Sequence, residues 1–465
     1  MLLWVPWNSI ARLGSANALL GSITPLGNLF GRALPSVSVI QYPLLVIVSV
    51  SGNGDSAETI SLPNAHADPY EPVQLGPVVR FSSIRAVFQD YINSEHLLVT
   101  LRFPFLIISL FTRILTTRQP HTIMSVFVSG ATGFIAQHIV GQLLEQNYKV
   151  IGSARSQAKI DELQAKFDNN PNLSMVIVSD IALLDAFDEA FKTHGKDIKY
   201  VLHTASPFQF NVSDYEKDLL IPARNGTVGI LEAIKKYAAD TVERVVITSS
   251  MAAIFDITSL DKDDVVFTEE SWNPDTWESC QRNGPSAYCG SKKFAEEAAW
   301  KFYNENKDQV KFKMSAVNPV YVFGPQRFDA DVSKTLNTSC EFINAALHST
   351  PENEAQAFAG GYIDVRDVAK AHLYAFQKEN TIGKRLLMSQ GAFNTQDILN
   401  YLNADFPALK GTIPIGTPAN GIEHSTKGAK TDNHKTKEIL GYEFMGLKQT
   451  IDDTASQILK QEGRL

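Results

Sequence analysis

The sequence predicts an α/β protein in which a parallel, doubly wound sheet of the Rossmann type is followed by a smaller C-terminal domain that covers the substrate. Three observations predict this class. Short apolar runs alternate with amphipathic stretches along residues 124–320, which is typical of βαβ units. A glycine-rich turn directly follows the first run. The runs end in polar or small residues, and ligands of such sheets bind at the carboxyl ends of the strands.

Composition limits the kind of partner and the compartment. The hydrophobic fraction of 44% and the charged fraction of 20% are those of a globular protein with a sizeable core. The net charge of −8 argues against a nucleic-acid partner, because neutralising phosphates needs a basic face. The three cysteines form no CxxC pair and no metal-ligand spacing, so no metal site is predicted. Their small, odd number favours a reducing compartment, and we predict the cytoplasm.

The first 123 residues differ from the rest. They contain seven arginines, six acids and no lysine. Residues 37–50 have a strand-like composition, whereas the apolar residues 97–115 are interrupted by Arg102, Pro104 and Arg113. A membrane-spanning helix needs about 20 apolar residues with few charges, so a membrane partner is not expected. A form tethered through 97–115 is the alternative.

A complete first strand opens at Met124, and we expect the functional enzyme to begin there. Residues 1–123 are then an irregular extension, either an upstream continuation of the reading frame or a segment that faintly resembles a mitochondrial transit peptide. The predicted domains are this extension, a dinucleotide-binding domain at 124–320 with returning segments, and a mainly small substrate domain at 321–465.

A strand, a glycine turn and a helix follow one another at residues 126–144. Gly130 and Gly133 lie in the turn, and apolar residues recur with helical spacing after it. We expect Gly130 to allow the tight turn, Gly133 to let the backbone approach a pyrophosphate, and Ala136 to allow close helix packing. The N-terminus of the helix would bind the phosphates. The pattern therefore predicts a dinucleotide site rather than an ordinary glycine turn.

The end of the second strand, residues 149–153, indicates which dinucleotide is bound. NAD-selective proteins place a carboxylate here for the ribose 2′-hydroxyl, but no acid occurs between Lys149 and Asp161. Arg155 and Lys159 stand where a 2′-phosphate would lie, and arginine suits phosphate recognition. We therefore predict NADP(H), with a solvated pair of surface bases as the alternative.

Four more strands are predicted at 175–178, 200–203, 245–247 and 314–317, with an amphipathic helix at 219–237. Because the carboxyl ends of parallel strands meet at one edge, Asp180, Thr204, Ser250 and Asn318 are expected to face one crevice. Asp180 is placed to hydrogen bond to an adenine or, alternatively, to cap the following helix.

Tyr288 and Lys292 carry the predicted chemistry. Ser286 starts a helix, and residues four apart share a helical face, so the phenol and the ammonium point the same way. We expect the ammonium to lower the pKa of Tyr288 from about 10, which makes the phenol a general acid near neutral pH. Tyr288 would protonate the oxygen of a carbonyl that receives a hydride, and the Ser250 hydroxyl would hold that oxygen. Lys292 would also bind the nicotinamide ribose.

Nine segments carry a resemblance to a known family, among them SVFVSGATGFIAQHIV, VLHTASPF, RVVITSSMAAIFD, AYCGSKKFAEEAAW and AVNPVYVFGPQ. They resemble the extended short-chain dehydrogenase/reductase family, in the branch of the dihydroflavonol reductases, and the resemblance covers 124–465 but none of 1–123. It implies NADPH-dependent reduction of small aldehydes and ketones of the methylglyoxal and isovaleraldehyde type, with Ser250, Tyr288 and Lys292 as the catalytic triad.

The resemblance also implies the residues that surround the reactants. The substrate pocket would be shaped by Phe208, Ser250, Phe255 and Tyr321. The cofactor contacts would be Gly130, Thr132, Gly133, Phe134, Ile135, Arg155, Lys159, Asp180, Ile181, Thr204, Ala205, Ser206, Tyr288, Lys292, Pro319 and Val322.

Beyond Val322 the strict alternation loosens. Helices are predicted at 329–347, from 362 through 376, at 395–402 and at 450–459, and a strand at 385–388. His372 is expected to be packed in the core rather than catalytic.

Two other classes of protein share these motifs. An NAD-dependent epimerase or dehydratase of nucleotide sugars has the same fold and the Tyr/Lys pair, but Arg155 and the apolar pocket candidates weigh against it. A non-catalytic dinucleotide sensor would not need Ser250, Tyr288 and Lys292 together. The predicted partners are a small carbonyl substrate and, further, a second copy of the chain in a homodimer.

Overall fold

The computed structural model describes residues 124–206, 212–352, 357–421 and 428–465, together with three short strands nearer the N-terminus. Contacts divide the chain into two compact units, Met1–Phe111 and Thr112–Leu465. In the first unit, β1 (Leu2–Leu3), β2 (Val37–Tyr42) and β3 (Leu45–Val50) form an antiparallel sheet. The strand-like composition of residues 37–50 is therefore confirmed, whereas segment 97–115 lies outside the described residues.

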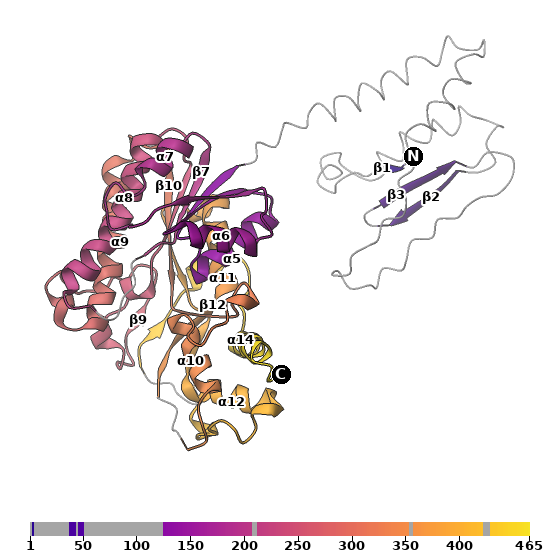
Figure 1. Ribbon diagram of the computed structural model, residues 1–465, viewed down its shortest axis with the longest axis vertical. Helices are drawn as coiled ribbons and strands as arrows, with labels where there is room; N and C mark the ends of the chain where they lie inside the picture. Colours follow the sequence, from indigo (N-terminus) through magenta and orange to yellow (C-terminus); the bar gives the residue numbers. More distant parts are fainter. Residues whose placement is uncertain are drawn as a thin grey trace, which may run out of the picture. The chain divides into compact units, whose positions relative to one another are not determined.

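A parallel sheet forms the centre of the second unit, with helices on both of its faces (Figure 1). Its seven strands follow the order β13-β10-β8-β7-β4-β5-β6. In chain order, β4, β5 and β6 follow one another from the middle of the sheet to one edge. The later strands, β7, β8, β10 and β13, follow one another from the middle to the other edge. This is the doubly wound arrangement, whose switch point lies between β4 and β7. Each predicted strand overlaps an observed one: β4 (Ser125–Ser129), β5 (Lys149–Ala154), β6 (Leu173–Ile177), β7 (Ile198–His203), β8 (Arg244–Thr248), β10 (Lys313–Pro319) and β13 (Arg385–Met388).

Helices cover both faces of this sheet, because successive strand residues point to opposite sides. Val126 and Val128 pack on the face covered by α5 (Phe134–Glu145), α6 (Gln157–Lys166) and α11 (Val365–Gln377). Phe127 packs on the other face, which is covered by α7 (Asp188–His194), α8 (Ile221–Tyr237) and α9 (Gly284–Asn306). A single turn of π-helix, Glu216–Leu220, leads into α8.

A smaller three-stranded sheet forms the centre of the C-terminal region. It consists of β11 (Tyr321–Phe323), β12 (Ala359–Asp364) and β14 (Gly391–Asn394). Phe323 and Phe393 from this sheet pack with α10 (Thr338–Leu347), α12 (Thr395–Asp405) and α14 (Leu447–Gln461). Strand β13 instead returns to the large sheet, where it pairs with β10. The remaining strand pair is β9 (Val266–Phe267) with β15 (Lys430–Thr431), and α13 (His434–Leu440) follows it.

Two helix predictions in this region need correction. The helix predicted at 329–347 is wrong in its first half, where the structure has one 3-10 turn, Asp329–Asp331, and α10 begins only at Thr338. Long-range pairs hold this charged stretch, since Asp331 pairs with Lys166 of α6. The helix expected from 362 begins at Val365, because the preceding residues complete β12 and the Asp364 carboxylate caps the helix, accepting from the Arg366 N–H at 2.8 Å.

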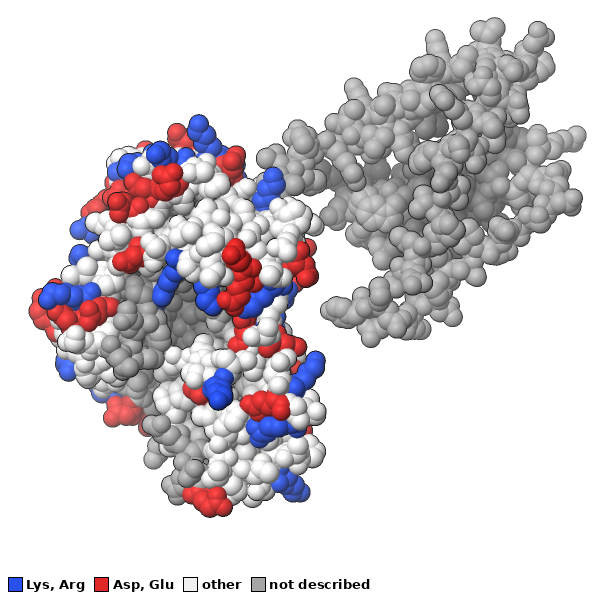
Figure 2. Space-filling model, viewed as in Figure 1, with Lys and Arg blue, Asp and Glu red and all other residues white. Residues whose placement is uncertain are grey.

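No helix in the described parts of the chain is long and apolar enough to cross a membrane. On the described surface that faces the viewer in Figure 2, acidic and basic side chains are interspersed.

Asp367 on α11 should make the stability of this fold depend on pH. Its side chain is 4% exposed and accepts a hydrogen bond from the Met445 N–H at 2.7 Å. Burial, with a smaller contribution from the Asp364 charge, raises the pKa of Asp367 to about 6. Because the folded state holds this proton more tightly than the unfolded chain, the contribution of Asp367 is fully favourable only below about pH 4, and is lost as the pH rises through about 6.

We expect Asp367→Asn to increase the free energy of unfolding by about 2 kcal/mol near pH 7, with the gain shrinking as the pH falls toward 4. Urea unfolding at a series of pH values measures this. Asp364→Asn is the matched control, because it removes an ion-pair partner of Arg366 and should destabilise the protein near neutral pH. A constant effect of Asp367→Asn across the pH series would contradict the prediction.

Candidate active site

The glycine turn has the tight geometry that the sequence predicted. Gly130 has a φ of +65°, and a Cβ at this position would lie 3.0 Å from the Cβ of Ala205. The Gly130 N–H donates to the Ser153 hydroxyl at 3.0 Å, and the Gly133 N–H donates to the Gly130 carbonyl at 2.9 Å. Gly133 is the N-cap of α5 and has no side chain to cap it. The first N–H groups of α5 are therefore available to an anion.

Ala136 packs closely beneath α5 as predicted, whereas the cofactor contacts predicted for its neighbours stay predictions. Ala136 is 2% exposed in the core beneath α5. Phe134 and Ile135 are partly buried and pack against the same core cluster, which also contains Val322 from β11. Thr132 is partly exposed within the turn. Residues from the glycine turn and from β11, far apart in the sequence, thus share one hydrophobic cluster.

Ser129 ties the glycine turn to the end of β7. Its hydroxyl oxygen accepts from the N–H groups of Thr204 and Ala205, each at 3.0 Å. Its own proton is therefore available to the His203 Nδ1, at 2.9 Å. Burial, with a smaller effect of the Lys292 charge, lowers the pKa of His203 to about 3, so the ring is neutral. Thr204 and Ala205 are thereby fixed beside the turn, at the switch point of the sheet.

Ser250, Tyr288 and Lys292 meet where β8 ends and α9 begins. Ser250 is the N-cap of the 3-10 turn Met251–Ala253 and hydrogen bonds to Tyr288. The Lys292 Nζ lies 5.7 Å from the centre of the Tyr288 ring and donates to the Ser206 hydroxyl at 2.7 Å. Helix α9 begins at Gly284 because the Asn283 side chain accepts from its first turn. The structure therefore brings the three predicted catalytic residues together.

The prediction that Lys292 lowers the pKa of Tyr288 is wrong. Burial raises the pKa of Tyr288 to about 12, and the hydrogen bond with Ser250 only partly opposes this. Burial also lowers the pKa of Lys292 to about 8. Removal from water disfavours the charged form of each group, and burial is the largest cause of both pKa shifts. Tyr288 consequently keeps its proton at neutral pH, as a proton donor must.

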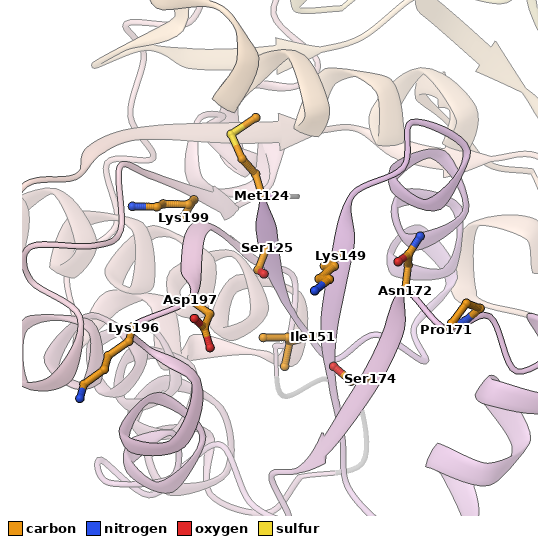
Figure 3. Close-up of a pocket in the computed structure, with 10 residues that line it drawn as sticks. All are labelled: Met124, Ser125, Lys149, Ile151, Pro171, Asn172, Ser174, Lys196, Asp197 and Lys199. Carbon is orange, nitrogen blue, oxygen red and sulfur yellow. The ribbon is translucent and has the colours of Figure 1, made fainter. Parts of the chain in front are cut away.

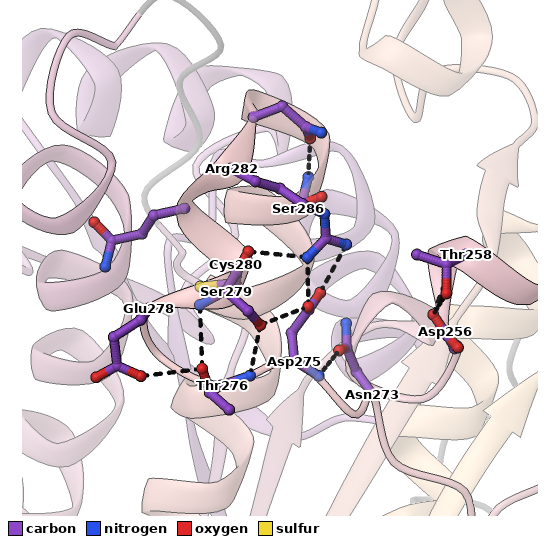
Figure 4. A network of polar contacts seen from close by, with 12 residues as sticks. Asp256, Thr258, Asn273, Asp275, Thr276, Glu278, Ser279, Cys280, Arg282 and Ser286 are labelled. Carbon is purple, nitrogen blue, oxygen red and sulfur yellow. Dashed lines mark hydrogen bonds and ion pairs between the residues drawn. The ribbon is translucent and has the colours of Figure 1, made fainter.

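Residues 273–282, which precede α9, are held by a network of hydrogen bonds between polar side chains (Figure 4). Asp275 accepts from the Arg282 guanidinium at 2.5 Å and from the Ser279 hydroxyl at 2.8 Å. Asn273 is 1% exposed and donates its side-chain N–H to the Ala252 carbonyl at 3.1 Å. The turn of Ser250 and the approach to the catalytic helix are therefore joined through Asn273.

The two bases predicted at the 2′-phosphate differ in their surroundings. Arg155 is exposed directly after β5, and no ion pair involves it within the described parts of the chain. Lys159 is also exposed, but its Nζ lies 2.7 Å from a carboxylate oxygen of Glu162. Arg155 is thus the more available of the two for an anionic ligand.

Asp180 does not cap a helix. Its side chain accepts from the Ala182 N–H at 2.9 Å in a turn, and α7 begins only at Asp188. The helix-capping alternative is therefore wrong, whereas the predicted contact with an adenine stays a prediction. Ile181 is partly buried against the core beneath α7 and α8.

The predicted pocket residues Tyr321 and Phe255 pack in two different hydrophobic clusters. Tyr321 lies close enough to Tyr288 to raise the pKa of Tyr288. The Tyr321 ring packs edge-on against Phe342 and Phe358, with ring centres 5.8 and 5.2 Å apart. Phe255 instead packs into a small cluster with Phe267. Phe208 lies outside the described residues. Pro319 and Val322, predicted as cofactor contacts, are buried at the end of β10 and in β11.

His372 is packed as predicted. It is fully buried, accepts from or donates to the Thr248 hydroxyl at 2.7 Å, and donates from Nδ1 to the Val368 carbonyl at 2.8 Å. Burial lowers the pKa of His372 to about 4. These contacts join α11 to β8 and leave the ring a structural role.

A hollow of about 650 Å³ opens at the amino ends of the strands (Figure 3). The candidate active site lies at the other end, where the strands have their carboxyl ends. Ser125 and Lys149, the first residues of β4 and β5, line it together with Lys196, Asp197 and Lys199. None of the predicted site residues that the structure describes lines this hollow, so it is separate from the candidate active site.

The sequence reasoning missed a buried polar cluster behind Ser250. Glu296 on α9 is 1% exposed and pairs with Arg385 of β13, with 2.6 Å between the Glu296 Oε1 and the Arg385 Nε. Glu296 also accepts from the Asn318 side chain at 2.7 Å. The sequence did contain one sign that Glu296 lies near the site. Tyr288, Lys292 and Glu296 follow one another at intervals of four residues, so they share one helical face.

The glycine turn at the switch point and the Ser-Tyr-Lys arrangement define a dinucleotide-dependent oxidoreductase of the extended short-chain dehydrogenase/reductase class. The chain belongs to the 3-beta hydroxysteroid dehydrogenase/isomerase family, whose sequence profile matches residues 127–393.

Two curated relatives and one crystal structure are especially similar. The NADPH-dependent methylglyoxal reductase GRE2 of Saccharomyces cerevisiae is 64% identical over 342 residues, which cover 74% of this chain and 100% of that protein. The putative NADPH-dependent methylglyoxal reductase GRP2 of Candida albicans is 46% identical over 339 residues, covering 72% and 98%. The crystal structure of yeast methylglyoxal/isovaleraldehyde reductase Gre2 complexed with NADPH has a TM-score of 0.72 at 64% identity, covering 74% of this chain and 100% of that chain.

Proposed function

We propose that this chain is an NADPH-dependent reductase that converts small aldehydes and ketones to alcohols. The observation that carries this proposal is the meeting of Ser250, Tyr288 and Lys292 beside the glycine turn, at the switch point of the sheet. The 64% identity to a methylglyoxal reductase supports the same activity. Methylglyoxal and isovaleraldehyde, named for the yeast relatives, are the proposed substrates.

The residues at the switch point fit NADPH. Gly130 stands where a Cβ would press against Ala205, and the start of α5 offers uncapped N–H groups to a pyrophosphate. Arg155, exposed and without an ion pair to any described residue, offers its guanidinium to a 2′-phosphate. When bound, NADPH would supply the hydride. Lys292, which donates to Ser206 here, would offer the same donor to the ribose hydroxyls.

Tyr288 and Ser250 would handle the oxygen of the carbonyl substrate. Because burial raises the pKa of Tyr288 to about 12, the phenol is protonated at neutral pH and can give its proton to an oxygen that becomes negatively charged. Ser250, already hydrogen bonded to Tyr288, would donate to the same oxygen and stabilise the developing charge.

The proposed substrate pocket has an aromatic wall. Tyr321 lies near Tyr288 and packs with Phe342 and Phe358, and such rings favour small apolar substituents on a carbonyl carbon. Phe208 and Phe255 remain proposed members of this wall. The proposed functional unit spans 124–465, with nucleotide-binding residues mainly at 124–320 and substrate-covering residues mainly at 321–465.

The function is tested by NADPH oxidation with methylglyoxal and isovaleraldehyde as substrates. We expect turnover with both, a clear preference for NADPH over NADH, and no conversion of a nucleotide sugar. Turnover of a nucleotide sugar with bound NAD would support the epimerase alternative. NADPH binding without any carbonyl turnover would support the sensor alternative.

A cytoplasmic location and a homodimer also belong to this proposal. The three cysteines are all free and buried, as expected of a protein in a reducing compartment. Fluorescence microscopy of the tagged chain tests the location, and sedimentation equilibrium tests the oligomeric state.

A further inference from the structure

The Glu296 carboxylate is the centre of the polar cluster behind the active site. It accepts from the Ser249 hydroxyl at 2.6 Å, the Asn318 side chain at 2.7 Å and the Trp300 indole N–H at 3.1 Å. The Arg385 guanidinium donates to both of its oxygens, at 2.6 and 3.2 Å. One buried carboxylate on α9 thus joins the ends of β8 and β10 to β13.

Three of these contacts lead directly to the turn that carries Ser250. Ser249 is the preceding residue, and the Asn318 side chain also donates to the Ser250 carbonyl at 3.3 Å. Arg385 reaches the Ala253 carbonyl at 3.5 Å, where the turn ends. The turn is therefore held at its start, at Ser250 itself and at its end by groups that Glu296 orients.

Glu296 also lies on the helix that carries the proton donor. It follows Tyr288 by eight residues, about two helical turns, so both side chains lie on one face of α9. A displacement of this helix relative to the turn would separate Ser250 from Tyr288. A buried, fully hydrogen-bonded charge holds such a junction in one geometry, because every alternative leaves charges without partners.

We propose that Glu296 is a positioning residue for the reduction: it holds the turn of Ser250 against α9, so that the Ser250 hydroxyl stays in contact with Tyr288. The inference rests on the proposed roles of Ser250 and Tyr288. It assigns Glu296 no contact with substrate or cofactor, so Glu296 acts through Ser250.

Glu296→Gln in the full chain tests this role. Glutamine is nearly isosteric but cannot accept all five donors, so the turn should shift and kcat should fall roughly 10- to 100-fold. The dissociation constant of NADPH, measured by fluorescence titration, should change less than about twofold, since the glycine turn is untouched. An unchanged kcat, or a loss of NADPH affinity as large as the loss of kcat, would overturn the proposal.

A double-mutant cycle with Ser250→Ala shows whether Glu296 acts through Ser250. In the Ser250→Ala background, Glu296→Gln should change the remaining kcat less than about twofold, because the group that it positions is gone. Equal loss in both backgrounds would overturn the positioning role. A full kcat in Ser250→Ala alone would instead refute the proposed role of Ser250, and the inference with it.

Two further variants separate positioning from stability. Glu296→Gln/Arg385→Gln leaves no unpaired buried charge and should recover much of the lost Tm while kcat stays low. Recovery of kcat together with Tm would show a purely structural role. Trp300→Phe is the matched control, because it removes one hydrogen bond to Glu296 that does not lead to the turn, and kcat should not change.

Discussion

Tyr288→Phe should lower kcat for carbonyl reduction by roughly 10³-fold, within the usual range for loss of a general acid. The phenylalanine ring fills the same space but carries no proton, and only Ser250 would remain to hold the oxygen of the substrate. The dissociation constant of NADPH should stay near that of the wild type. Stopped-flow absorbance of NADPH measures the hydride step, and fluorescence titration measures the binding.

Tyr303→Phe is the matched control for this prediction. Tyr303 lies on the same helix, where its ring packs against Phe312 with centres 5.7 Å apart, away from Ser250. The Tyr303→Phe substitution also removes a phenol hydroxyl, but one that is not part of the candidate active site, so kcat should be unchanged. If Tyr288→Phe retained wild-type turnover, Tyr288 could not be the proton donor, and the proposed mechanism would fail even if NADPH still bound.

Arg155→Glu should lower kcat/KM for NADPH about 10- to 100-fold more than for NADH, because hydrogen bonds between charged groups contribute about 1.5–3 kcal/mol each. The guanidinium at the end of β5 is proposed to pair with the 2′-phosphate, and a carboxylate there would repel it. A carboxylate can also accept from a ribose 2′-hydroxyl, which favours NADH. Initial rates with both cofactors, at one fixed aldehyde concentration, measure the ratio.

Lys159→Glu provides the comparison for Arg155→Glu. Lys159 already pairs with Glu162, so its charge is partly neutralised and its loss should change the cofactor ratio less. Equal changes in kcat/KM for NADPH and NADH in Arg155→Glu would refute recognition of the 2′-phosphate at this position.

Local patterns in the sequence determined the large sheet and the main members of the site. The apolar runs that became β4, β5, β7 and β8 are short and buried on both faces, so each was recognisable by itself. Gly130 was predictable because a tight turn after a strand requires it. The shared face of Tyr288 and Lys292 was predictable because helix geometry alone fixes residues four apart.

The tertiary structure alone decided the features that depend on distant residues. Strand β13 returns to the large sheet, and Asp331 pairs with Lys166 where a helix was expected, because contacts across the chain outweigh local periodicity. The pKa of Tyr288 is raised because burial depends on everything packed around the phenol. By its sequence alone, Glu296 is an ordinary acidic residue of a helix. Its burial could not be predicted, because Arg385 and Asn318, which surround it in the fold, are distant in the sequence.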